Sequence, residues 1–132
     1  MKYAIKRFFW ITVLIFVFSM WIDSTSTFLV FSVDKEYGLK HEVNTQVVSD
    51  VKNYGIGAIF FVENSVLLSH YYLSLVVGGL FFASHVRKTI KIYSENEIIA
   101  ISMGIGFLSF AFLKAGAAFF NFIVLAKLLS FI

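Results

Sequence analysis

Three long apolar runs alternate with two polar connections along this chain of 132 residues. The apolar runs cover residues 8–33, 55–85 and 98–131, and the polar connections cover residues 34–54 and 86–97. A helix needs about 20 apolar residues to cross the hydrocarbon core of a bilayer, so each run is long enough for one span. The pattern predicts an all-α integral membrane bundle of three long transmembrane helices, folded as a single domain over residues 1–132.

The length of the second and third runs leaves a four-helix alternative open. One helix over the second run would reach about 48 Å, whereas the hydrocarbon core is about 30 Å thick. Two spans would need about forty residues and a turn, which neither run provides. Three long or tilted helices are therefore preferred, with Gly78-Gly79 as the place where the second could break. The absence of proline also favours uninterrupted helices.

Composition supports a membrane protein. Hydrophobic residues make up 59% of the chain and charged residues 14%, whereas a soluble domain is about 45–50% apolar and about 25% charged. The mean hydropathy is +0.84. The chain has no cysteine, which excludes disulfides and thiolate sites. The expected surroundings are the lipid bilayer and other membrane subunits, or further copies of the chain.

The basic residues indicate a topology. They gather before the first run and directly after the second, at Lys2, Lys6, Arg7, Arg87, Lys88 and Lys91. Because positive clusters stay on the cytoplasmic side, we expect a multi-pass protein with a cytoplasmic N-terminus and an outside C-terminus. This pattern also accounts for the net charge of +3 without a nucleic-acid partner. In the outer connection, residues 41–51 are expected to form a short amphipathic helix at the membrane surface.

A polar stripe interrupts the first apolar run. Asp23 has Ser19 and Thr27 as its i−4 and i+4 neighbours, so the three share one helix face, and Ser26 extends it. A carboxylate inside the membrane costs several kcal/mol unless it is paired, protonated or facing water. We therefore expect this face to point into the bundle. Trp21, which lies deep in the same run, is expected to pack inside the protein.

The other two runs contain matching polar groups. Glu63 and His70 lie two turns apart on one face of the second run, and Lys114 and Asn121 lie two turns apart in the third. Lys114 is the natural counter-ion for Asp23 or Glu63. Small residues beside it would let another helix approach closely, at Gly104, Ala111, Ala115 and Ala118. The candidate intramembrane polar network is thus Asp23, Thr27, Glu63, His70, Lys114 and Asn121.

Three roles are open to this network. The first is structural pairing that fixes helix register, and the second is a proton or ion path, since ionisable groups inside a membrane often mark one. The third is a metal site built from Asp23, Glu63 and His70. The chain has no close metal-binding spacing such as H-x-x-x-H or E-x-x-H. We therefore predict no metal, no cofactor and no catalytic residue.

A motif in the first third of the chain resembles a known family. Asp23 and Thr27, followed by Glu42 and Asn44, resemble the D-x-x-x-T … E-x-N pattern of a domain-of-unknown-function family of small prokaryotic membrane proteins. That family usually has a proline after the asparagine, where this chain has Thr45. The resemblance implies an architecture of a few membrane helices and no particular activity.

The leading prediction of function is a small accessory or structural subunit that packs against partner helices in a larger membrane assembly. The sequence contains no nucleotide-binding loop, nucleophile motif or soluble catalytic module, so we do not expect an enzyme. The alternative is an oligomeric proton or ion transporter, channel or holin-like pore. A virion membrane or coat protein is the third possibility, because short hydrophobic helical proteins also serve there.

Overall fold

The computed structural model describes residues 2–86 and 93–130, except for the side chains of residues 62–72 and 74. Most of the described residues lie in helices, and the described ranges contain no strand. The all-α prediction is therefore confirmed. The helices are α1 (Tyr3–Val33), α2 (Lys35–His41), α3 (Thr45–Tyr54), α4 (Ala58–Val86) and α5 (Glu95–Leu128).

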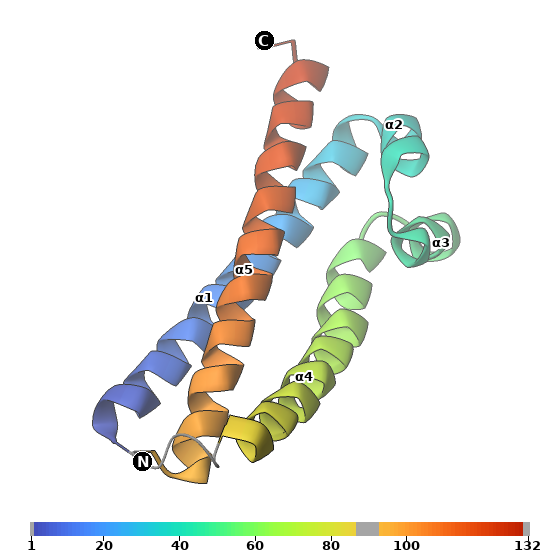
Figure 1. The fold of residues 1–132 in the computed structure, drawn as a ribbon. Coiled ribbons are helices and arrows are strands. Elements are labelled where there is room, and N and C mark those ends of the chain that lie inside the picture. The colour runs from blue at the N-terminus through green and yellow to red at the C-terminus, as the bar shows by residue number, and fades with distance from the viewer. Residues whose placement is uncertain (1, 87–92, 131–132) are drawn as a thin grey trace.

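Three of these helices are long, and two short ones fill the connection between α1 and α4 (Figure 1). By length and composition, α1 and α5 can each cross a membrane, while the described apolar stretch of α4 is shorter, Leu75–Val86. Both α4 and α5 are continuous helices. The helix does not break at Gly78-Gly79, and neither run divides in two as the four-helix alternative requires.

α1 and α5 lie side by side and run in the same direction, with α4 antiparallel to both (Figure 1). This pair packs more extensively than any other pair of helices. Its hydrogen bonds join residues separated by 95, 91 and 94 positions along the chain. Such a nearly constant separation requires a parallel pair, because it would change steadily along an antiparallel one. The N-terminal ends of α1 and α5 consequently lie at the same end of the molecule.

The apolar core lies where α1 meets α5. It is built from Phe16, Met20, Met103, Phe107 and Ala111, and the Phe16 and Phe107 rings are 5.3 Å apart. Gly104 on α5 faces the Phe8 ring and the Thr12 hydroxyl, which would crowd any added Cβ. The expected small-residue face therefore does admit a neighbouring helix, at Gly104, Ala111 and Ala118, whereas Ala115 is exposed.

The polar connection after α1 is more ordered than its composition suggests. Asp34 caps α2 by accepting a hydrogen bond from the Tyr37 amide at 2.9 Å, and Asn44 caps α3 through the Gln46 amide. The predicted amphipathic helix exists but begins four residues later than expected, because Asn44 occupies the N-cap. The apolar face of α3 then packs on the ends of α1 and α4, through Val47, Val51, Phe31 and Ile59.

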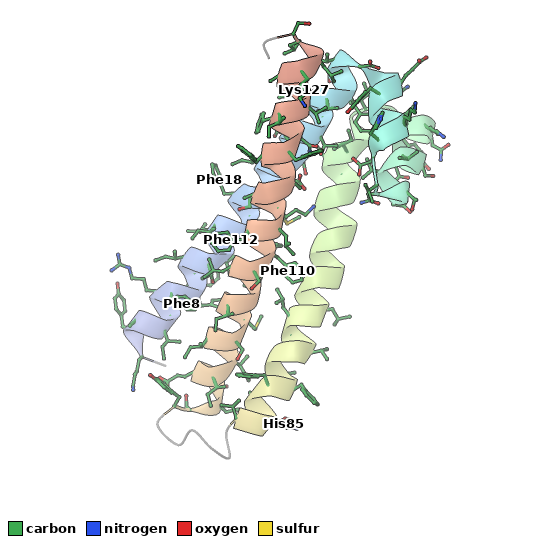
Figure 2. All side chains as sticks on the ribbon, turned by 45° about the horizontal axis from the view of Figure 1, so that its top comes forward. Phe8, Phe18, His85, Phe110, Phe112 and Lys127 are labelled. Atoms are coloured by element: carbon green, nitrogen blue, oxygen red, sulfur yellow. The ribbon has the colours of Figure 1, made fainter. Side chains whose placement is uncertain are left out.

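The position of Trp21 differs from the prediction that it packs inside the protein. Its side chain is 59% exposed rather than packed inside the protein. It shares the outer surface of α1 with Trp10, Leu14 and Phe18, all of which are exposed. Figure 2 shows Phe18 on the side of α1 away from α4. The polar stripe takes the inner face of α1, so the neighbouring large side chains turn outward.

Candidate functional site

The polar stripe of α1 faces the helix α5. Ser19, Asp23, Ser26 and Thr27 are all buried, as expected for polar groups that must avoid lipid. Ser19 donates its hydroxyl hydrogen to the Ile15 carbonyl oxygen at 2.8 Å, and Ser26 donates to the Asp23 carbonyl oxygen at the same distance. These bonds to the preceding helical turn satisfy the hydroxyl groups without help from solvent.

An ion pair joins the centres of α1 and α5. The Lys114 ammonium Nζ lies 2.7 Å from the Asp23 carboxylate Oδ2. The Asp23 side chain is 6% exposed and that of Lys114 is 18% exposed. The structure therefore places Asp23 in direct contact with Lys114, while the side chain of Glu63, the other partner that the sequence offers, lies outside the described residues. Because the two opposite charges lie next to each other, neither is left uncompensated in apolar surroundings.

Asn121 extends the contact two turns further along α5. Its amide Nδ2 donates to the Ser26 hydroxyl oxygen at 3.1 Å and to the Thr27 hydroxyl oxygen at 3.0 Å. Four of the six candidate network residues, Asp23, Thr27, Lys114 and Asn121, thus form one cluster between two helices. In the part of the chain that the structure describes, no buried side-chain nitrogen or oxygen lacks a hydrogen-bond partner.

Glu63 and His70, the remaining two candidates, lie within the backbone of α4, but their side chains fall outside the described residues. The metal site proposed from Asp23, Glu63 and His70 therefore has no described geometry. Among the described residues, no three histidine, aspartate or glutamate side chains come close enough to hold a metal ion.

A hollow of about 400 Å³ opens beside the cluster. Asp23 and Lys114 form part of its wall, together with His41, the last residue of α2, and Glu42, which follows it. The Glu42 carboxylate accepts a hydrogen bond from the Asn44 amide at 2.8 Å. His41 is exposed and stacks on Tyr37, with the ring centres 4.0 Å apart.

The candidate network drawn from the sequence leaves out His41 and Glu42, and it therefore misses their place at this hollow. Helix periodicity relates residues within a helix, so it gives no signal for a contact between a connection and two spans. The residues of the family-like motif, however, come together here. All four of its residues, Asp23, Thr27, Glu42 and Asn44, line this hollow.

A second polar contact lies at the other end of the α1–α5 pair. The Glu97 carboxylate accepts hydrogen bonds from the Ser94 amide at 3.0 Å and from the Lys2 amide at 2.7 Å. Ser94 caps α5 in return by accepting from the Glu97 amide. The backbone bond from Ser94, followed by that from Lys2, lowers the pKa of Glu97. This carboxylate stands before the apolar part of α5, at the polar end of the helix.

The geometry of the main cluster permits two kinds of role. Short ion-pair and hydrogen-bond contacts between α1 and α5 can fix their register, while the hollow beside Asp23 and Lys114 can bring water to a titratable pair.

A comparison of the chain with protein-family models, with curated proteins and with solved structures finds no match in any of the three.

Proposed function

We propose that the chain is a multi-pass membrane protein with three spans, a cytoplasmic N-terminus and an outside C-terminus. α1 and α5 run in the same direction, and α4, which lies between them along the chain, runs in the opposite direction (Figure 1). This arrangement supports an odd number of crossings. At 29 residues, α4 is about 44 Å long, more than the bilayer core of about 30 Å requires. The basic residues at the start of α1 and after α4 support the orientation.

Within the membrane, we propose that the protein serves as a small accessory or structural subunit that packs against larger partners. The observation that carries this proposal is the division of α1 into two faces. Its polar face is buried against α5, and its opposite face exposes Trp10, Leu14, Phe18 and Trp21. Large aromatic side chains are typical anchors at protein interfaces, and the internal pairing of Asp23 leaves this outer face wholly apolar.

Purification from native membranes in a mild detergent tests this role. We expect larger subunits to co-purify in fixed stoichiometry, and the double substitution Phe18→Ala/Trp21→Ala to release them while the melting temperature stays unchanged. Phe61→Ala on α4 is the matched control, since Phe61 is also a highly exposed phenylalanine. Isolation of the chain as a closed ring of identical copies would favour a pore, and retention of the partners by the double variant would contradict the interface.

A second candidate function, an oligomeric proton or cation path, is favoured by one observation. The hollow lined by Glu42 and His41 reaches the Asp23–Lys114 pair, so titratable groups continue from the outer connection to the middle of α1. Flux across vesicles that contain the purified protein tests this candidate. Wild-type flux that disappears in a well-folded Asp23→Asn/Lys114→Met variant would establish a path, because a relay needs the titrating groups themselves. Absence of wild-type flux would exclude it.

A further inference from the structure

An apolar groove separates the C-terminal part of α4 from the N-terminal part of α5. Its volume is about 490 Å³, and its wall includes Gly78, Phe82, Ile101, Ser102 and Ile105. The Ser102 hydroxyl is directed to the Ile98 carbonyl oxygen at 2.8 Å. The one polar side chain on this part of the α5 wall therefore makes its hydrogen bond within its own helix, and the groove offers an apolar surface to whatever enters it.

Glycines shape the groove. Gly79 faces α5, where an added Cβ would lie 3.3 Å from the Met103 side chain, and Gly106 faces the Leu75 side chain. At these two glycines α4 and α5 approach each other closely. Gly78, one residue from the first contact, has no atom within 4 Å of the Cβ position. The helices thus meet closely on one side and leave open space on the other.

The groove's size and polarity decide between occupants. An apolar wall offers water few hydrogen-bond partners, and an apolar cavity of about 150 Å³ accommodates one benzene molecule. The groove is about three times larger, at about 490 Å³, which is room for a hydrocarbon chain of ordinary lipid length. Tyr93 stands at one end of the groove, with the Lys2 ammonium 4.9 Å from its ring centre. That end therefore has the amphipathic character of a membrane interface.

We propose that this groove binds one acyl chain of a bilayer lipid, held between α4 and α5 as part of the folded protein. The inference rests on the proposed insertion of the chain in a membrane, where lipid tails are the medium that surrounds the groove. The bound tail would supply the packing contacts that the Gly78 side of α4 lacks. It would also make the contact between α4 and α5 dependent on lipid.

Photolabelling tests the site. The purified protein is reconstituted in phosphatidylcholine vesicles doped with a phosphatidylcholine that carries a diazirine in one acyl chain, and labelled residues are located by mass spectrometry. We expect labelling to concentrate on Gly78–Phe82 and Ile101–Ile105. The substitution Gly78→Leu should lower it several-fold, because leucine would occupy the groove. Gly116→Leu is the matched control, since Gly116 also has no atom within 4 Å of its Cβ position.

A second variant, Ser102→Leu, fills the groove from the α5 wall and should lower the labelling in the same way. Labelling spread evenly over the outer face of α1, and unchanged by both groove variants, would overturn the proposal. Loss of self-association in Gly78→Leu without groove labelling in the wild type would instead assign the groove to a second copy. Failure of the chain to insert in vesicles would overturn the membrane assignment as well, whereas an inserted, partner-binding protein with an unlabelled groove would overturn the lipid site alone.

Discussion

At the scale of single residues, the main polar contact between α1 and α5 is the ion pair of Lys114 with Asp23. The two atoms of the pair are 2.7 Å apart and both side chains are mostly buried. Removing one partner of a buried ion pair leaves the other charge without compensation, whereas removing both is often nearly neutral. The effects of the two single changes should therefore not add.

We expect Lys114→Met to lower the free energy of unfolding by about 3–5 kcal/mol, and Asp23→Asn/Lys114→Met to recover most of that loss. Denaturant unfolding in detergent, followed by circular dichroism, measures both. Lys127→Met is the control, because Lys127 lies exposed in the last turn of the same helix. Recovery in Glu63→Gln/Lys114→Met, and not in the Asp23 double variant, would make Glu63 the dominant partner.

At the scale of helices, Gly38 fixes how α2 folds back on the end of α1. An added Cβ at this position would lie 2.8 Å from the Phe31 ring, a distance too short for two carbon atoms. The ring is almost fully buried and belongs to the small core with Val47, Val51 and Ile59, so it cannot move freely. α2 would have to lift away from α1 instead.

Gly38→Ala should therefore lower the free energy of unfolding by about 1–3 kcal/mol, the usual cost of overpacking a core. Gly57→Ala provides the comparison, because its Cβ position has no atom within 4 Å. Thermal unfolding of the two variants and the wild type gives the measurement. Equal melting temperatures for all three would show that α2 is not held against Phe31.

Sequence reasoning predicted the long helices well, because apolar runs and the absence of proline are properties of each segment alone. It also placed Asp23 and Thr27 correctly on a buried face, since one helix turn relates them. It did not predict α2, whose seven residues carry no long periodic pattern. Nor could it show that Asp23 lies in direct contact with Lys114, because such a contact depends on how separate helices rotate against one another. Trp21 was misplaced for the same reason.

At the scale of the whole molecule, Glu97 joins the beginning of the chain to the beginning of α5. Its pKa is lowered by the backbone hydrogen bonds from Ser94 and Lys2. A carboxyl group whose pKa is lower in the folded state stabilises that state fully above its ordinary pKa of about 4.3. This contribution is lost as the pH falls through the lowered value.

We therefore expect the melting temperature of the wild type to fall more steeply than that of Glu97→Gln as the pH is lowered from 6 to about 3. Glu36→Gln, at an exposed position in α2, should leave the wild-type profile unchanged. Parallel pH profiles for the wild type and Glu97→Gln would show that the carboxylate does not contribute to the contact between α1 and α5.

The proposed topology gives another prediction for the whole molecule. The chain lacks cysteine, so single cysteines at Ser94 and at a C-terminal extension provide clean reporters. In intact cells, an impermeant thiol reagent should label the C-terminal cysteine and reach Ser94→Cys only after the membrane is permeabilised. Tyr54→Cys, at the exposed end of α3, should be labelled from outside as a control. Equal labelling of Ser94→Cys and the C-terminus would contradict three spans.

The separation of 91 positions between Asp23 and Lys114 also means that the two residues are synthesised at different times. A ribosome adds about 5–20 residues per second, so the carboxylate is made roughly 5–18 seconds before the ammonium that neutralises it. During that interval an inserted α1 would carry a polar stripe without its partner helix, at a cost of several kcal/mol for an ionised group. In the proposed membrane topology, the nascent helix would therefore remain at the water interface, or borrow polar groups from the insertion machinery, until α5 emerges.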